Sequence, residues 1–240
     1  GCLPLEGVLG LSTSMDTVGP LARDVADAAA LYTALMGRYD AGNCHAPDLS
    51  CVDPARLNLA LPSNLVWQGL GSGVERAARG AVARLQAAGV RVQEAEIPEF
   101  DEVEALISHF GPFHAAECHA LWHEFIEARP NLVYAPILER IRLGGKMLAS
   151  TVEGAKQGLR KLTPALHARM RQVGVLAMPT IAISPPAIAE LESDLEAWKA
   201  ANVMTLRNTR LGNFLDCTAL TLPCGKDDSG IPVGLMLMAP

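Results

Sequence analysis

Two short apolar segments separated by an amphipathic stretch constrain the fold of this chain most strongly. Residues 57–61, Leu-Asn-Leu-Ala-Leu, predict a strand that ends at Pro62. Residues 73–88 carry apolar side chains at helical spacing and are followed by Gly89, after which residues 90–92 alternate as a second strand. A strand–helix–strand unit of this kind usually forms a crossover between parallel strands. The chain is therefore predicted to be an α/β protein.

The C-terminal residues predict a second kind of strand pairing. Residues 173–178 predict a buried strand, and residues 219–223 and 233–238 predict two more. Lys226–Gly230 lies between the last two and is a strong hairpin-type turn signal, so these two strands are expected to pair as a hairpin. The predicted fold is a mixed β-sheet flanked by helices, in a single α/β unit over residues 1–240.

Helical spacing of apolar side chains predicts most of the remaining elements. The first helix is expected to begin at Pro20, whose missing N–H would be unpaired there anyway, and to stop at Gly37. Residues 40–55 are expected to form a loop. Further helical regions are expected at residues 101–172, 190–201 and 203–215. The longest of them is predicted to break at Gly111-Pro112, Pro130-Asn131 and Gly144-Gly145.

Composition excludes several classes of protein. Half of the residues are apolar and 19% are charged, which excludes a disordered chain. Twenty basic and 26 acidic residues give a net charge of −6, so nothing overall attracts nucleic acid or anionic lipid. No stretch approaches the roughly 20 apolar residues of a membrane-spanning helix, and no signal peptide is visible. Six cysteines without a C-x-x-C pair indicate reduced thiols and a cytoplasmic location.

Histidine spacing leaves zinc binding as an alternative but favours ordinary surface or core histidines. Two pairs have the i,i+4 spacing that lets both side chains face one metal ion: His119 with His123, and His114 with Cys118. The H-E-x-x-H order is missing, because Glu117 precedes both histidines of the first pair. No pattern supports a third ligand at His45 or His167.

Other local motifs that carry chemistry are missing from the sequence. Six acidic residues between Glu94 and Glu104 are interpreted as a solvated approach to a helix rather than as metal ligands. The chain has no G-x-S-x-G nucleophile elbow and no glycine-rich phosphate-binding motif. We therefore expect no cofactor and no metal.

Longer patterns resemble one family. Residues 9–29, which include Ser-Thr-Ser-Met-Asp-Thr-Val-Gly-Pro-Leu-Ala-Arg, closely resemble the S-x-S-x-D-T-x-G-P-x-A-R-x-V-x-D-A-A segment of amidase signature enzymes. Residues 208–237 are similar to the family's T-x3-N, A-x-x-x-P-x-G and G-x-P-x-G ending, and Met178-Pro179-Thr180 resembles its strand-ending M-P-T. These motifs occur in family order and span nearly the whole chain.

The resemblance implies hydrolysis of carboxamides, or transfer of the released ammonia to a partner. The family uses a Ser, cis-Ser, Lys triad, in which the serine attacks the amide carbon and the lysine moves the proton through the bridging serine. Backbone N–H groups of a glycine- and serine-rich loop stabilise the oxyanion. In the family that loop lies upstream of the segment matched here, and this chain has no adjacent serine pair. We expect no catalytic residue within residues 1–240 and no activity from them alone.

Three residues are expected to contact substrate: Arg140, Thr209 and Asn213. Thr209 and Asn213 lie four residues apart at the end of the last predicted helix, a region that approaches the substrate pocket in the family. Arg140 begins a stretch that resembles the R-x-x-L-G of the A subunits of glutamine amidotransferases, where an arginine grips the substrate carboxylate. The alternatives are a solvated helix charge for Arg140 and side-chain bonds to a strand junction for Thr209 and Asn213.

The first family motif is given a structural interpretation. Asp16 or Thr17 is expected to accept hydrogen bonds from first-turn N–H groups of the helix beginning at Pro20, and Arg23 is expected to pair nearby. A role in ordering the loop beside the nucleophile is the alternative for Asp16 and Arg23.

The predicted function is that of the C-terminal portion of an amidase-signature hydrolase acting on a small amide. Leu206 stands where the A subunits of amidotransferases carry an acidic residue, which favours a stand-alone amidase over the A subunit of a tRNA-dependent glutamine amidotransferase. An allophanate hydrolase-like enzyme is a minor branch, and a truncated non-catalytic binding or structural protein is the third hypothesis. No membrane partner is expected, nucleic acid is expected only in the amidotransferase case, and a homodimer is left open.

Overall fold

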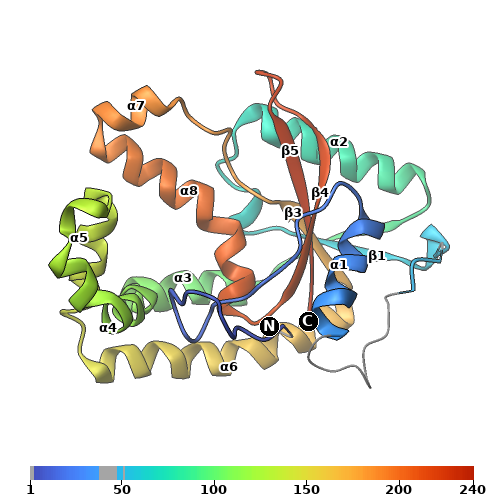
Figure 1. Cartoon of the computed structure of the whole chain (residues 1–240). Coiled ribbons are helices and arrows are strands. Elements are labelled where there is room, and N and C mark those ends of the chain that lie inside the picture. The colour runs from blue at the N-terminus through green and yellow to red at the C-terminus, as the bar shows by residue number, and fades with distance from the viewer. Residues whose placement is uncertain (1–2, 38–47, 51) are drawn as a thin grey trace.

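The computed structural model describes residues 3–37, 48–50 and 52–240. Within them, five strands form one sheet in the order β2-β1-β3-β5-β4 (Figure 1). The strands are β1 (Asn58–Pro62), β2 (Arg91–Ala95), β3 (Val175–Pro179), β4 (Thr218–Lys226) and β5 (Pro232–Ala239). Strand β1 is parallel to β2 and β3, whereas β5 is antiparallel to both β3 and β4. The predicted mixed α/β sheet, including its C-terminal hairpin, is confirmed.

The described helices flank this sheet. They are α1 (Val25–Gly37), α2 (Ser72–Ala87), α3 (Pro98–Phe110), α4 (Phe113–Ala128), α5 (Ala135–Gly144), α6 (Ala149–Val173), α7 (Ile188–Ser193) and α8 (Leu195–Phe214). Short 3-10 turns occur at Pro54–Arg56, Leu65–Trp67 and Pro130–Leu132. Of the three breaks predicted in the helical middle, the first two fall between helices, and the third falls where α5 ends at Gly144. In the part of the chain that the structure describes, no helix is both long and apolar enough to cross a membrane.

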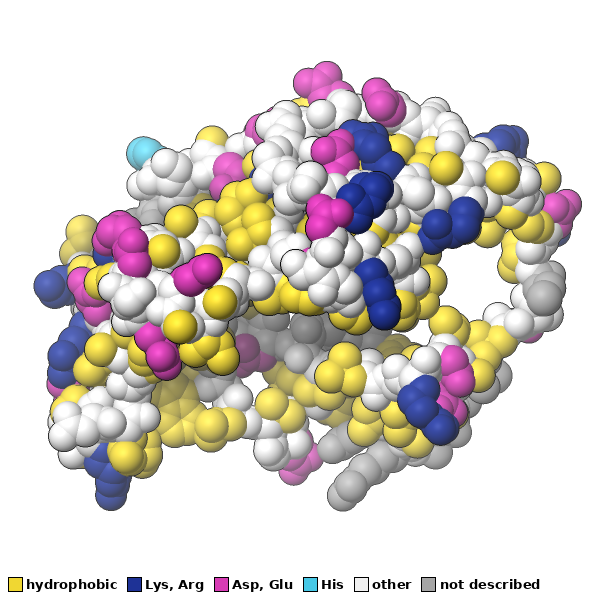
Figure 2. All heavy atoms as spheres, turned by 90° about the horizontal axis from the view of Figure 1, so that it is seen from above, with side chains coloured by type: hydrophobic (Ala, Val, Ile, Leu, Met, Phe, Trp, Pro, Cys, Tyr) yellow, Lys and Arg dark blue, Asp and Glu magenta, His cyan; other side chains and the backbone are white. Residues whose placement is uncertain are grey.

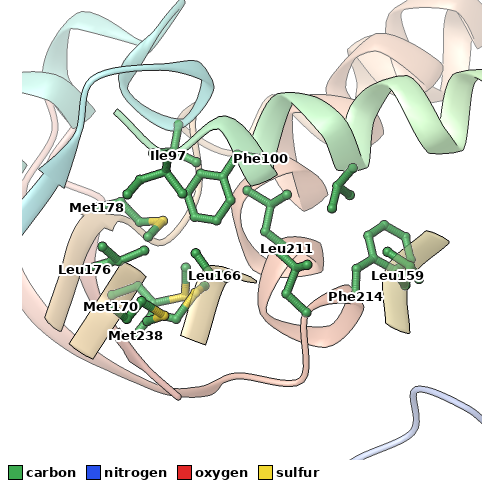
Figure 3. Close-up of a cluster of buried hydrophobic side chains, with 14 of the residues drawn as sticks. Ile97, Phe100, Leu159, Leu166, Met170, Leu176, Met178, Leu211, Phe214 and Met238 are labelled. Atoms are coloured by element: carbon green, nitrogen blue, oxygen red, sulfur yellow. The ribbon is translucent and has the colours of Figure 1, made fainter. Parts of the chain in front are cut away.

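Alternation along the strands divides the core into two layers. In β3, Ala177 packs in the layer that contains α2, whereas Leu176 and Met178 pack in the layer built by α3, α6 and α8. Figure 3 shows Met178 of this second layer close to Phe100 of α3. The central strands β1 and β3 are therefore covered on both faces, whereas most of β4 is exposed. Helices α4 and α5 lie with α8 on the side away from α2 (Figure 1).

Helix α6 packs closely on α3 and sets the position of β3. A Cβ at Gly158 would lie 2.0 Å from the Cδ1 atom of Leu106, so any larger residue there would require the Leu106 side chain to move. Gly174 follows the helix with φ of 98°, and a Cβ there would lie 2.3 Å from the carbonyl oxygen of Asn58. The chain thus turns directly from α6 into the strand that pairs with β1.

The predicted start of the first helix is wrong. Helix α1 begins at Val25 instead of Pro20, because the carboxylate of Asp24 accepts a hydrogen bond from the Asp27 N–H at 2.9 Å and caps the helix there. Of the predicted loop at 40–55, residues 40–47 and 51 lie outside the described residues, and Pro54–Arg56 form a 3-10 turn.

The two helices predicted over 190–215 are also wrong in their boundaries. Helix α8 runs without a break from Leu195 to Phe214, and the shorter α7 precedes it. Asp194 separates them, since its carboxylate accepts hydrogen bonds from the N–H groups of Glu196 and Ala197 at 2.9 and 3.1 Å. No glycine or proline interrupts the sequence near residue 202, so the helix continues.

The surface mixes apolar and charged side chains. Figure 2 shows Lys and Arg interspersed with Asp and Glu on one face, with hydrophobic side chains between them. Helix α1 contributes no buried side chain, although its sequence is largely apolar. Leu21 in the segment before it is 96% exposed. This apolar helix therefore contributes no side chain to the buried core of the described residues.

Candidate functional site

The first family motif forms a tight turn closed by Asp16. The Asp16 carboxylate accepts hydrogen bonds from the backbone N–H groups of Leu11, at 2.8 Å, and Ser12, at 3.0 Å. Its side chain is therefore used well before α1 begins, and the predicted helix cap at Asp16 is wrong. The second part of that prediction is confirmed, because the Arg23 guanidinium pairs with Asp27 at 2.8 Å.

A buried carboxylate holds this turn against the helices. Glu117 of α4 accepts hydrogen bonds from the hydroxyls of Ser12 and Ser14, the latter at 2.8 Å, and forms an ion pair with Lys156 of α6. We call these four residues the Glu117 cluster. A second contact supports it, since the Trp122 indole N–H donates to the Gly10 carbonyl at 2.6 Å. The motif is thus fixed to both α4 and α6.

The Glu117 cluster stabilises a buried negative charge. Burial raises the pKa of Glu117, but hydrogen bonds from Lys156, Ser12 and Ser14 outweigh burial and hold the pKa below its ordinary value. Ser12 is only 2% exposed, and its hydroxyl donates to this weakly basic carboxylate. Ser12 is therefore poorly placed to attack a substrate. The cluster acts as a structural clamp that holds the first motif against α4 and α6.

The Asn208 end of the C-terminal motif is a second clamp. The buried Asn208 amide donates hydrogen bonds to the carbonyls of Val66, at 3.1 Å, and Pro179, at 2.7 Å. Arg207 donates to Asn208 at 3.1 Å and to the carbonyl of Gln68 at 2.8 Å. These carbonyls lie at or beyond the ends of β1 and β3, so α8 is anchored where two parallel strands stop.

Thr209 and Asn213 lie on the last turns of α8, one turn apart, as predicted. Asn213 is exposed, and Thr209 is half-buried with its hydroxyl donating to the carbonyl of Leu206 at 3.3 Å. The neighbouring clamp residues point into the core instead. Both residues are thus available at one surface of the helix, and the strand junction is held by Asn208.

Arg140 lies on α5, facing the first half of α8. Its guanidinium carbon is 5.8 Å from the ring centre of Trp198, and Tyr134 contacts the same indole edge to face at 5.8 Å. Arg140 is half-buried, and no carboxylate among the described residues forms an ion pair with it. The charge is held by aromatic contact alone.

A second polar cluster lies between α3, α4, α5 and α8. The Arg210 guanidinium of α8 donates to both carboxylate oxygens of Glu104 on α3. His114 of α4 lies beside Phe214, with ring centres 6.3 Å apart, and within the electrostatic influence of Arg140 and Arg210. Burial, and then the two arginine charges, lower the pKa of His114, so its imidazole is neutral at pH 7. We call Glu104, His114, Arg140 and Arg210 the arginine cluster.

The histidine pairs weighed as zinc ligands have other surroundings. The rings of His119 and His123 stack with centres 5.1 Å apart, and the described residues contain no group of three ligands suited to a metal ion. Burial raises the pKa of the Cys118 thiol, which disfavours the thiolate that zinc requires. His167 lies elsewhere, 3.1 Å from the Leu215 carbonyl, and His45 lies outside the described residues.

The acidic segment at 94–104 is less solvated than predicted. Glu99 is 3% exposed and pairs with Arg169 of α6 at 2.9 Å, and Glu104 belongs to the arginine cluster.

Sequence reasoning also missed three buried or paired cations, Lys156, Arg207 and Arg210. Apart from the neighbours of Arg207 on α8, their partners are 39 to 141 residues away in the sequence, so no local spacing indicates them. Among the residues of the second clamp, only Asn208 was indicated by the sequence, because it stands at the start of a family motif.

Comparisons with known proteins agree along the whole chain. A protein-family model described as Amidase matches residues 1–240. A 2-amino-5-chloromuconic acid deaminase from Comamonas testosteroni is 30% identical over 240 residues, covering 100% of this chain and 51% of that protein. The A subunit of a glutamyl-tRNA(Gln) amidotransferase from Akkermansia muciniphila is 27% identical, covering 98% of this chain and 56% of that protein. The chain spans about half the length of these relatives.

Solved structures share the fold. The structure described as "Crystal structure of amidase" superposes with a TM-score of 0.79 at 23% identity, covering 100% of this chain and 52% of that chain. A 6-aminohexanoate cyclic dimer hydrolase complexed with substrate gives a TM-score of 0.67 at 22% identity, covering 91% and 50%. At these identities the likeness concerns the arrangement of the sheet and its helices.

Proposed function

The chain belongs to the amidase family, and we propose that it forms the C-terminal portion of a hydrolase that cleaves carboxamide C–N bonds. The observation that carries this proposal is the family match over residues 1–240, with 30% identity to a deaminase along the whole chain. The sequence motifs support it independently, because they follow the family order from Leu9 to Leu237.

In this proposal the nucleophile lies outside residues 1–240. A serine attacks the amide carbon, the C–N bond breaks as the nitrogen takes a proton and leaves, and water then hydrolyses the acyl-serine ester to a carboxylate. The burial of Ser12 in the Glu117 cluster is consistent with a nucleophile elsewhere. The described residues would supply walls of the substrate pocket and hold the first motif in place.

Arg140, Thr209 and Asn213 are the proposed substrate contacts. The exposed Asn213 and the half-buried Thr209 occupy one face of α8, and Arg140 lies on the neighbouring α5 without a carboxylate partner in the described structure. An amide side chain and a hydroxyl can orient a substrate by hydrogen bonds, and a guanidinium can bind an acidic group. The Arg207–Asn208 clamp would keep this face of α8 in register with the sheet.

The A subunit of a glutamine amidotransferase is the second candidate function. The relative from Akkermansia muciniphila favours it, since 98% of this chain aligns with that protein. Leu206 weighs against it, because an apolar side chain that is 44% exposed stands where such proteins carry an acidic residue. A stand-alone amidase is therefore the first proposal.

Ammonia release from a panel of carboxamides by the product of the complete reading frame tests the proposal. We expect turnover that needs no tRNA, that falls at least tenfold in Asn213→Ala, and that is unchanged in Asn202→Ala on the same helix. Turnover that requires glutamine and aminoacylated tRNA would support the amidotransferase instead. A pure, folded protein that hydrolyses no amide and shows no such transfer would support the non-catalytic alternative.

We also propose a cytoplasmic location. The support is that Cys118, Cys217 and Cys224 are free thiols, and that burial raises the pKa of Cys217 to about 12, which keeps that thiol protonated. Cys2, Cys44 and Cys51 lie outside the described residues. Cell fractionation with an antibody to the protein tests this location, and recovery from a secreted fraction with oxidised cysteines would contradict it.

A further inference from the structure

Strand β4 is an edge of the sheet that the described residues leave uncovered. It stands last in the strand order, and no described strand pairs with its outer side (Figure 1). Residues 218–221 and Pro223 are exposed and Leu222 is half-buried, although alternate residues of a strand point to opposite faces. Both faces of this segment are therefore exposed, directly beside β5 side chains such as Leu235 and Met236 that are buried.

The opposite edge of the sheet, β2, is built differently. It has five residues, and Arg91 and Glu94 place charges on it. Short strands and charged side chains are features by which natural sheets prevent pairing at an edge. In β4, residues 218–223 carry no charge, and Lys226 comes only beyond a β-bulge. Strand β2 thus has the usual protection of a free edge, whereas this part of β4 does not.

Hydrogen bonding within the sheet shows which backbone groups β4 directs outward. The Thr180 N–H donates to the Gly234 carbonyl at 2.9 Å, so the backbone groups of Gly234 point toward the β3 side. Its partner on β4 is Pro223, and in such an antiparallel pair the groups of both residues point away from each other. The missing N–H of Pro223 therefore costs no bond to β5. By alternation, the N–H and C=O groups of Thr221 and Ala219 also point out of the sheet.

These outward groups fit a further β-strand. Ala219 and Thr221 are two residues apart, which is the spacing at which a strand presents its hydrogen-bonding groups to one neighbour. Leu220 and Leu222 would lie beside the added strand on one face, which favours apolar side chains there. Pro223 offers no N–H, and the bulge that follows it disrupts the ladder, so the pairing would end at this residue.

The added strand has two conceivable sources, a second copy of this chain and the rest of the complete protein. Pairing between two copies of β4 would place two uncovered strands side by side, so their faces would stay exposed. A longer polypeptide can supply both a strand and the side chains that cover those faces. The chain spans 51% and 56% of two relatives, so each of those proteins has a further segment of similar size. A covalently attached segment also has a high effective concentration.

We propose that a β-strand from the part of the complete protein outside residues 1–240 pairs with β4 through the backbone groups of Ala219 and Thr221. The inference rests on the proposed function, in which these residues form the C-terminal portion of a longer hydrolase, and it states how the two portions join: one sheet runs through both. Strand β4 begins five residues after Asn213, so the added strand brings the remaining portion to the end of α8 that carries this proposed substrate contact.

Amide hydrogen exchange in the complete protein, resolved residue by residue and corrected for intrinsic rates, tests the pairing. The N–H groups of Ala219 and Thr221 should exchange at least about tenfold more slowly than those of Val92 and Glu94. The latter two are the internal control. The Arg91 N–H is directed toward β1, so the N–H groups of residues 92 and 94 point out of the sheet at the β2 edge.

A matched pair of variants separates backbone pairing from simple burial. Thr221→Pro removes an outward N–H and should speed exchange at Ala219 at least tenfold, whereas the N–H groups of Leu220 and Leu222, which point to β5, should stay protected. Thr221→Val keeps the N–H, loses the hydroxyl that donates to Thr180, and should leave exchange at Ala219 unchanged. Equal exchange at Ala219 in the two variants would overturn the pairing.

The outcomes separate this inference from the proposed function. Amide turnover by a complete protein whose β4 and β2 edges exchange equally fast would overturn the inference and leave the amidase proposal intact. Slow exchange at β4 in a complete protein that hydrolyses no amide would support the continuous sheet and overturn the amidase proposal. Protection of Ala219 and Thr221 that appears only as the protein dimerises in sedimentation experiments would assign the edge to a second copy and overturn the inference.

Discussion

The Glu117 cluster and the arginine cluster both gather charged groups between neighbouring helices, but only one of them is complete. In the first, a single carboxylate meets one ammonium and two hydroxyls. In the second, the Arg210 guanidinium pairs with Glu104, Arg140 pairs with no carboxylate of the described residues, and two buried nitrogen atoms lack hydrogen-bond partners among those residues. The complete cluster fixes the first family motif to α4 and α6. The incomplete cluster leaves Arg210 Nε and His114 Nδ1 without a hydrogen-bond partner in the described structure.

This difference separates residues that hold the fold from residues that do not, and the proposed substrate contacts Arg140 and Asn213 belong to the second group. Removing a member of a complete buried cluster leaves its partners unpaired, which is strongly destabilising. Removing an unpaired cation leaves nothing behind it unsatisfied. Stability and ligand binding should therefore respond to different substitutions, and each prediction below tests one side of that division.

The largest effect is expected in the Glu117 cluster. Glu117→Gln should lower the free energy of unfolding by about 3 kcal/mol, since Lys156 loses its counter-charge beside a side chain that is 8% exposed. Denaturant unfolding measures the change. Glu124→Gln, an exposed position on the same helix, is the matched control and should change stability by less than about 0.5 kcal/mol. Equal effects of the two substitutions would contradict a clamp at Glu117.

The two asparagines of α8 should differ in the next largest effect. Asn208→Ala removes both amide donors from the carbonyls of Val66 and Pro179, and is expected to cost about 2 kcal/mol in unfolding free energy. Asn213→Ala, on the exposed face, should cost less than about 0.5 kcal/mol while reducing amide turnover. Thermal unfolding and ammonia release on the same samples measure both. A loss of stability in Asn213→Ala would make its role structural.

A smaller, pH-dependent effect is expected at His114. Its pKa in the folded protein lies below the ordinary value of 6.5, so the unfolded chain binds the proton more readily. Stability should therefore fall as pH drops through 6.5, by less than about 1 kcal/mol between about pH 7.5 and 5.5. His114→Gln should flatten this part of the stability profile. A profile that keeps the same slope in this variant would assign the pH dependence to other groups.

The smallest effect on stability is expected for Arg140. Because no carboxylate in the described structure pairs with it, Arg140→Met should change the free energy of unfolding by less than about 0.5 kcal/mol. Chemical denaturation at low and high salt measures it. A loss of about 2 kcal/mol or more would show that Arg140 belongs to the structural side of the comparison.

The elements that follow from local pattern were predicted well. The strand predicted at 57–61 is observed at Asn58–Pro62, and the three helix breaks fall where glycine or proline interrupts the pattern. The start of α1 was not predicted, because Asp16 and Asp24 are both competent caps and only the tertiary position of Asp16 shows that it closes its own turn. The continuity of α8 was also missed. The sequence near residue 202 contains no glycine or proline, and the spacing of apolar residues alone does not show whether one helix or two form there.

The functional residues depended on contacts between distant parts of the chain. Thr209 and Asn213 could be placed on one helix face from their spacing alone. Glu117 was noticed only for its position among histidines, and its partners Ser12 and Lys156 are 105 and 39 residues away. Nothing in the local sequence of Arg210 distinguishes it from a surface cation. Such clusters become visible only when helices α3, α4, α5 and α8 are brought together.

The most direct test of the account is ammonia release from the panel of carboxamides by two proteins, residues 1–240 and the product of the complete reading frame. We expect turnover from the complete protein and none above background from residues 1–240, because in the proposed function these residues would supply walls of the substrate pocket and the nucleophile would lie outside them. Turnover by residues 1–240 that disappears when one of their own serines is replaced by alanine would contradict the account.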